Sequence, residues 1–311
     1  MANPTMTRSR GKIHVVFHHT KEERRAPFFE QIDEEKHPAL CRLEKEFDKL
    51  IGLEKVKKLL KEIYAWLYVN DIRKESGLKS EKQSLHMIFK GNPGTGKTTV
   101  ARIIAQFFRE MNVLSKGHLV EVERADLVGE YIGHTAQKTR EMIKKANGGV
   151  LFIDEAYSLA RGGEKDFGRE ALDTIVRNIE DKKDDLIVIL AGYPHEIDYL
   201  LTLNPGLPSR FPIIIEFPDY TTEELMLIAK QMLKEREYEL SFDAETKLRE
   251  YFETEAKHHY FPFGNGRFVR NVIEEAIRNQ AVRLLRENQF DRKSLTTILT
   301  KDFSFLRQKQ L

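Results

Sequence analysis

Short apolar runs alternate with amphipathic, helix-like stretches through the middle of this chain. Each run is long enough for one buried strand, and the runs lie at 84–89, 119–122, 150–153, 186–191 and 213–217. Strands that alternate with helices in this way are typical of layered α/β proteins. The pattern therefore predicts an α/β fold with a doubly wound parallel sheet.

The strand pattern stops after Pro218, and helical periodicity takes over. Thr221 to Glu224 read Thr-Thr-Glu-Glu, a capping box that favours the start of a helix. Apolar residues then recur at helical spacing in three segments, 225–237, 244–254 and 267–286. We predict a small all-helical domain in this part of the chain.

These patterns divide the chain into three parts. We expect the α/β domain at 46–219, and the helical domain with a C-terminal tail at 220–311. Residues 1–45 follow neither pattern, because they are rich in charge and histidine and contain one strand-like patch at Ile13–Phe17. This N-terminal extension is expected to be either a flexible arm or a segment that docks a partner.

Composition narrows the class of protein. The chain carries 51 basic and 49 acidic residues, and its formal net charge of +2 gives no field that would attract nucleic acid or a membrane surface. The longest apolar run, 186–191, is too short to cross a bilayer, and the polar N-terminus lacks the apolar core of a signal peptide. Cys41 is the only cysteine, which excludes an internal disulfide. We expect a cytoplasmic protein without membrane or nucleic-acid partners.

The segment Gly91–Thr98 fills every fixed position of the phosphate-binding loop G-x-x-x-x-G-K-[ST]. It follows the predicted strand 84–89 and precedes a predicted helix at 99–108. Its glycines allow several backbone N–H groups to point at one anion, and the helix N-terminus adds a positive dipole end. The predicted nucleotide-binding residues are Gly91, Asn92, Pro93, Gly94, Thr95, Gly96, Lys97, Thr98 and Thr99.

Individual roles follow from the chemistry of the side chains. Lys97 is expected to act in catalysis by binding the β and γ phosphates, and the Thr98 hydroxyl to bind Mg²⁺. The predicted strand 150–153 ends in Asp154, which can hold Mg²⁺ through its water shell, and Glu155, which can polarise the attacking water. A solvated acidic pair is the alternative, but the upstream Lys97 favours the functional interpretation. No Asn-Lys-x-Asp segment for guanine occurs, so the expected cofactors are ATP and Mg²⁺.

Together with Leu50–Leu53 and Gly264–Arg267, these motifs resemble those of AAA+ ATPases. Three further segments resemble the CbbX-like branch of that family: Tyr131–Thr135, Ala191–Tyr193 and Asn204–Phe211. The resemblance covers about residues 45–290. It implies a AAA+ P-loop NTPase fold in which the helical domain is a lid over the nucleotide.

The resemblance also assigns roles to basic residues. In AAA+ ATPases the subunits form a ring, usually a hexamer, and an arginine of one subunit reaches the γ-phosphate held by its neighbour. Arg210 matches this catalytic position, with an ordinary surface arginine as the alternative. Arg267 matches the lid residue that senses nucleotide in its own subunit, and Arg270 competes with it from one helical turn away. Two further nucleotide-binding residues are implied, Ile51 and Gly52.

One expected sensor is missing from the sequence. AAA+ ATPases generally carry Asn, Ser or Thr at the tip of the strand that ends here at Ala191, but this chain has Gly192 and Tyr193. Tyr193 either orients the attacking water through its hydroxyl or packs against a neighbour. We therefore assign it no catalytic role.

Tyr131, Ile132 and Gly133 match the aromatic-hydrophobic-glycine loop that lines the central pore of ring-shaped remodellers. An aromatic side chain on a mobile loop can grip an extended peptide without reading its sequence, and glycine lets the loop move. The alternative is a tyrosine packed at the boundary between a loop and the core.

Taken as a whole, the resemblance implies an ATP-driven homo-oligomeric ring that remodels a protein client in spore maturation. One alternative is a remodeller like the red-type rubisco activases. A second is an ATP-gated loader of DNA or replication factors, and the near-neutral charge argues against it. A third is a nucleotide-dependent assembly scaffold with little turnover.

Overall fold

A computed structural model of the chain describes residues 37–80, 83–131, 133–161, 167–181, 185–204, 206–257 and 264–304. The strand-like patch Ile13–Phe17, with the rest of residues 1–36, lies outside this part. So does Ile132, the middle residue of the predicted pore loop.

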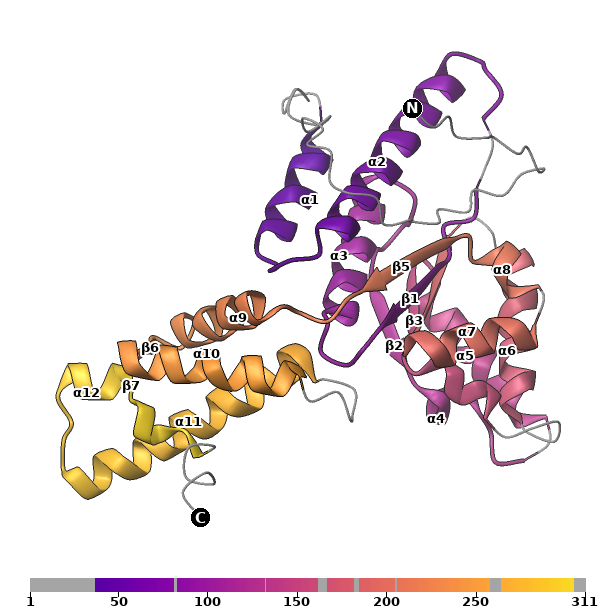
Figure 1. The fold of residues 1–311 in the computed structure, drawn as a ribbon. Helices are drawn as coiled ribbons and strands as arrows, with labels where there is room; N and C mark the ends of the chain where they lie inside the picture. The colour runs from indigo at the N-terminus through magenta and orange to yellow at the C-terminus, as the bar shows by residue number, and fades with distance from the viewer. Residues whose placement is uncertain are drawn as a thin grey trace, which may run out of the picture.

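The centre of the fold is a five-stranded parallel sheet with the order β2-β3-β4-β1-β5 (Figure 1). Its strands are β1 (Met87–Gly91), β2 (Leu119–Val122), β3 (Gly149–Ile153), β4 (Leu186–Gly192) and β5 (Ile213–Phe217). Every residue of β3 and β4 is buried, because helices cover both faces of the sheet. The predicted doubly wound α/β fold is confirmed, although β1 begins at Met87 rather than at Ser84.

Alternate residues of each strand point to opposite faces and build two cores. Phe89 joins a core with the helices α1 (Pro38–Asp48), α2 (Glu54–Glu75) and α3 (Lys97–Glu110). Ile88 joins the other core, under α4 (Arg124–Leu127), α5 (His134–Ala146), η1 (Ala156–Ala160), α6 (Phe167–Asp181), α7 (Pro194–Leu203) and α8 (Leu207–Arg210). The boundary expected at residue 46 falls inside α1, whose Leu40 and Leu43 are buried in the first core.

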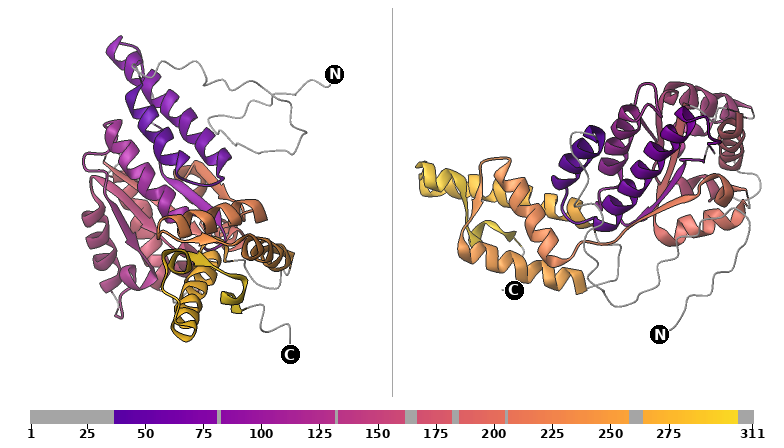
Figure 2. Two further views of the ribbon diagram at one scale, coloured as in Figure 1. Left: turned by 90° about the vertical axis from the view of Figure 1, so that its left-hand side faces the viewer. Right: turned by 90° about the horizontal axis from the view of Figure 1, so that it is seen from above.

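The C-terminal part has a core of its own and forms a separate body beside the sheet in Figure 2. Its elements are α9 (Thr222–Lys234), β6 (Glu239–Leu240), α10 (Phe242–Lys257), α11 (Asn265–Glu287), α12 (Arg292–Thr296), β7 (Thr297–Ile298) and η2 (Thr300–Asp302). The predicted capping box starts α9: the Thr221 hydroxyl accepts from the backbone of Glu224 at 3.3 Å, and the Glu224 carboxylate accepts from the backbone of Thr221 at 2.8 Å. The helical lid is confirmed, with the short parallel pair β6–β7 as an addition that periodicity does not predict.

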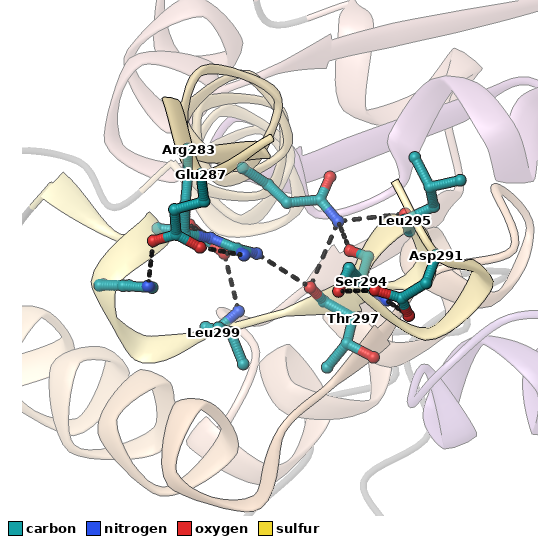
Figure 3. A network of polar contacts seen from close by, with 10 residues as sticks. Arg283, Glu287, Asp291, Ser294, Leu295, Thr297 and Leu299 are labelled. Atoms are coloured by element: carbon teal, nitrogen blue, oxygen red, sulfur yellow. Dashed lines mark hydrogen bonds and ion pairs between the residues drawn. The ribbon is translucent and has the colours of Figure 1, made fainter. Parts of the chain in front are cut away.

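A buried polar cluster, here called the lid network, attaches the last described segment to α11 (Figure 3). The Arg283 guanidinium donates to both carboxylate oxygens of Asp302, at 2.7 and 3.0 Å, and these residues are 9% and 1% exposed. The Gln280 amide donates to the carbonyls of Ser294, Leu295 and Thr297 at 3.0 to 3.2 Å. The network fixes the chain after α11 by polar contacts, in addition to the apolar contacts of Ile298 and Phe303 in the lid core.

Among the helices that the structure describes, none has the length and apolar character needed to cross a lipid bilayer.

Candidate nucleotide-binding site

A cavity of about 600 Å³ lies where the carboxyl ends of three strands meet the lid. Gly91 borders it at the end of β1, Asp154 follows β3, and Gly192 ends β4. The lid contributes residues of α9 and α11 from the opposite side. A crevice at the carboxyl ends of parallel strands is the usual ligand site of α/β proteins.

The predicted phosphate loop has the backbone that such a loop needs. Gly94 and Gly96 have φ of 73° and 92°, which glycine adopts at little cost. A Cβ on Gly91 would lie 2.5 Å from the carbonyl oxygen of Phe217, so β5 leaves no room for a side chain there. The buried Thr95 hydroxyl donates to the carbonyl of Asn92 at 2.8 Å and closes the turn. The loop then leads directly into the N-terminus of α3, whose dipole favours an anion.

Lys97 points back into this loop. Its Nζ donates to the carbonyl oxygens of Gly91 at 2.8 Å and Asn92 at 2.7 Å. Burial lowers the pKa of Lys97, while the charge of Asp154 opposes this shift. Burial therefore penalises the ammonium, and a phosphate in the cavity would stabilise it.

Asp154 and Glu155 both line the cavity opposite the loop. Glu155 has a left-handed backbone (φ 46°, ψ 42°), which is uncommon for a residue other than glycine, and its N–H donates to the Asp154 carboxylate at 2.9 Å. The described residues contain no cluster of three or more His, Cys, Asp or Glu that could hold a metal. Thr98 and Asp154 nevertheless fit Mg²⁺, which is usually bound by one or two carboxylates together with substrate phosphates and water.

The structure explains the missing polar sensor at the tip of β4. A Cβ on Gly192 would lie 2.7 Å from the ring of Tyr157, so only glycine fits. Tyr157 lines the cavity, and its ring centroid is 5.7 Å from that of Tyr193. Burial, followed by the charge of Glu155, raises the pKa of Tyr157 to about 12, so its hydroxyl keeps its proton. No sequence motif indicated Tyr157, whose only signal is its position two residues after Glu155.

Apolar side chains among those that line the cavity suit contact with a nucleobase. Ile51, predicted from the family resemblance, lines it, and Ile228 and Met232 face it from α9. Gly52 is not among the described lining residues. Its φ is 69°, and a Cβ there would lie 2.3 Å from the Glu224 carboxylate, so Gly52 lets the chain pass close to the lid.

Both candidate lid arginines, Arg267 and Arg270, line the cavity. Arg210 is different, because it is absent from the described residues that line the cavity of its own chain. It ends α8, and its guanidinium donates to the carbonyl of Gly206 at 2.8 Å.

Tyr131 also lies apart from the cavity. Its side chain is 66% exposed, and its ring centroid is 5.5 Å from that of His134. A Cβ on Gly133 would contact nothing within 4 Å. Tyr131 is therefore not one of the buried residues of the described cores.

Comparison with known families agrees with this geometry. Residues 87–219 match the family described as ATPase family associated with various cellular activities (AAA), and residues 221–311 match the AAA lid domain. A solved structure of a RuvB mutant from Thermotoga maritima is similar in fold, with a TM-score of 0.55 at 21% identity over 85% of this chain and 71% of that one.

Curated relatives are considerably more similar in sequence. Stage V sporulation protein K of Bacillus subtilis is 62% identical over 88% of this chain and 85% of its own length. The chloroplastic ribulose bisphosphate carboxylase/oxygenase activase of Cyanidioschyzon merolae is 47% identical over 76% of this chain and 80% of its own. Protein CbbX of Cereibacter sphaeroides is 46% identical over 81% of this chain and 82% of its own.

Proposed function

This chain belongs to the AAA family of ATPases, in the branch of the CbbX and CfxQ proteins, and from this premise we propose that it is an ATP-driven ring ATPase that remodels a protein client. The observation that carries the proposal is the cavity in which the phosphate loop, the pair Asp154–Glu155 and the lid arginines converge. Family membership implies ATP hydrolysis, whereas the ring and the client are our inference.

Each catalytic residue has a task that its position supports. Lys97 binds the β and γ phosphates and offsets their charge, and Glu155 accepts a proton from the water that attacks the γ-phosphorus. Bound Mg²⁺ would neutralise charge on the phosphate oxygens, and Thr98 and Asp154 would hold it. Arg267, with Arg270 as the alternative, contacts the phosphates from the lid.

Arg210 supports the ring. Because Arg210 is not among the described residues that line its own cavity, we infer that it acts at the active site of a neighbouring subunit in a homo-oligomer, for which we propose a hexamer. Arg210→Ala should then bind ATP and hydrolyse it poorly, and mixing it with Glu155→Gln should restore part of the activity. Mixed interfaces bring an intact cavity next to an intact arginine. Co-assembly without any recovery would place the action of Arg210 within its own subunit.

The client is proposed to be a protein that Tyr131, Ile132 and Gly133 grip in the central pore. The exposure of Tyr131 supports this role, and the 62% identity to a stage V sporulation protein supports a process in spore maturation. The decisive experiment is capture from sporulating cells with Glu155→Gln as a hydrolysis-dead trap in ATP. Lys97→Ala, which should lose nucleotide, is the control, and no protein enriched over that control would refute the proposal.

A rubisco activase-like role is the second candidate, and the 47% identical relative of that name favours it. It requires that the wild-type protein restore the activity of an inhibited red-type rubisco in the presence of ATP. Restoration that Glu155→Gln cannot achieve would replace the sporulation client with rubisco.

A further inference from the structure

Three side chains connect the phosphate loop, the segment after β5 and the first turn of the lid helix α11. The Asp219 carboxylate accepts from the Asn92 amide at 2.9 Å through each oxygen, and from the Asn265 amide at 2.7 Å. Asn92 belongs to the phosphate loop, Asp219 follows β5, and Asn265 begins α11. We call these three residues the clasp.

Asn265 is the centre of the clasp. Its side chain is fully buried, and its backbone is left-handed, with φ of 47°, a conformation that Asn tolerates. Its side-chain oxygen Oδ1 accepts from the backbone N–H of Tyr220 at 2.8 Å, which fixes the orientation of the side-chain amide. The amide nitrogen therefore faces Asp219, and it also lies 3.4 Å from the carbonyl oxygen of Pro93.

A backbone contact runs beside the clasp. The N–H of Gly266 donates to the carbonyl of Gly94 at 3.0 Å. A Cβ on Gly94 would lie 2.3 Å from the carbonyl oxygen of Gly264 and 2.7 Å from the nitrogen of Arg267. The phosphate loop and the start of the lid helix therefore touch through their backbones, next to the lid arginine.

We propose that Asn92, Asp219 and Asn265 are positioning residues, which hold the lid against the phosphate loop so that a nucleotide meets an assembled cavity. The nucleotide would contact the loop on one side and Ile228, Met232 and Arg267 on the other. When only a fraction of molecules has the loop and the lid in place, the apparent affinity for the nucleotide is the intrinsic affinity multiplied by that fraction. The clasp keeps that fraction high. This inference rests on the proposed nucleotide-driven function.

For Asp219→Ala, the clasp predicts a change in nucleotide affinity opposite in sign to the change expected from the charge alone. Asp219 carries negative charge close enough to Lys97 to act on its pKa, so removing this charge alone should tighten the binding of an anionic nucleotide. If the clasp operates, Asp219→Ala should weaken binding, because it removes the acceptor shared by Asn92 and Asn265. Asp219→Asn keeps an acceptor oxygen without the charge, and should bind at least as tightly as the wild type.

The experiment is a titration of the full-length protein with ADP that carries a fluorescent ribose label. We expect Asp219→Ala and Asn265→Gly each to raise Kd about ten-fold, and the double variant to add little to either. The glycine variant keeps the left-handed backbone accessible. Asp198→Ala is the matched control, because Asp198 is an exposed carboxylate, paired with Lys90, that does not line the cavity.

Hydrolysis gives a second measurement that a purely structural residue would not reproduce. The KM for ATP should rise about ten-fold in Asp219→Ala while kcat changes less than about three-fold, because saturating nucleotide itself holds loop and lid together. Unchanged or tighter ADP binding by Asp219→Ala, an equal loss in Asp198→Ala, or a lowered melting temperature with unchanged Kd would each overturn the inference. ADP binding requires no ring and no client, so failure of the proposed function leaves this test intact.

Discussion

The phosphate cavity and the lid network both gather polar side chains, but they use them differently. In the cavity, the Lys97 ammonium donates to two carbonyls of its own loop, and burial lowers its pKa. In the lid network, Arg283 meets both oxygens of Asp302, and this hydrogen bonding is the main cause of its raised pKa. The first cluster is arranged for a partner from solution, and the second is satisfied within the chain.

The backbone shows the same contrast. Glu155 takes a left-handed conformation beside the cavity, which costs on the order of 1 kcal/mol for a residue other than glycine. In the lid network, by contrast, Gln280 lies within the regular helix α11 and its amide donates to three carbonyls. Substitutions in the cavity should therefore reduce activity more than stability, whereas substitutions in the lid network should do the reverse.

The largest expected effect is on the stability of the lid. Arg283→Met leaves the buried Asp302 carboxylate with the backbone N–H of Leu299 but without its cationic partner, and should lower the free energy of unfolding by about 3 to 5 kcal/mol. Chemical denaturation monitored by circular dichroism measures this loss. Replacing both partners, as in Arg283→Met with Asp302→Leu, should recover part of it. An Arg283→Met variant that stays as stable as the wild type but loses affinity for ATP would contradict this contrast between the cavity and the lid network.

The next largest effect is on turnover. Glu155→Gln removes the base but keeps the shape of the side chain, so hydrolysis should fall by about 10² or more while ATP remains bound. Its melting temperature should stay close to that of the wild type, since Gln keeps an oxygen that can accept the hydrogen bond from the Tyr157 hydroxyl. A steady-state ATPase assay with a nucleotide-binding control measures both, and equal turnover of the two proteins would remove Glu155 from the mechanism.

The strand beneath the cavity provides a pH test. His86 is buried before β1 and its Nδ1 accepts from the backbone N–H of Val188 at 3.0 Å, and burial lowers its pKa from 6.5 to about 4. Only the unfolded chain then binds a proton between these values, so stability is complete above pH 6.5 and falls as the pH drops toward 4. At pH 5 we expect a loss of about 2 kcal/mol. His86→Asn, which keeps an acceptor and does not titrate, should lack this component of the pH dependence, and coincident pH profiles would contradict the assignment.

The smallest effect on stability is expected at Tyr131, which belongs to neither cluster. Because its side chain is largely exposed, Tyr131→Ala should change the free energy of unfolding by less than about 0.5 kcal/mol. Stimulation of hydrolysis by the captured client should nevertheless be lost. Tyr199→Ala is the matched control, since Tyr199 is a 60% exposed tyrosine on α7. A large drop in melting temperature for Tyr131→Ala would argue for a packing role.

Local patterns in the sequence were sufficient to predict those features that one short segment determines. The apolar runs predicted the five strands, and the Thr221–Glu224 capping box predicted the start of α9. The loop Gly91–Thr98 predicted a phosphate-binding site, because the backbone geometry of such a loop depends on glycines at fixed positions. These features depend on residues only a few positions apart, so they can be predicted from the sequence.

Tertiary structure decided what depends on residues far apart in the chain. Gly192 replaces the expected polar sensor because Tyr157, 35 positions earlier by residue number, fills the space that a side chain would need. Asp219 joins Asn92 to Asn265 across a fold that no local pattern describes, and Arg283 finds Asp302 only after the chain turns back along α11. A hydrogen bond or a steric limit between distant residues exists only once packing has set their positions. The sequence alone therefore determined the nucleotide loop, whereas the tertiary structure determined the contacts between distant residues that support this loop.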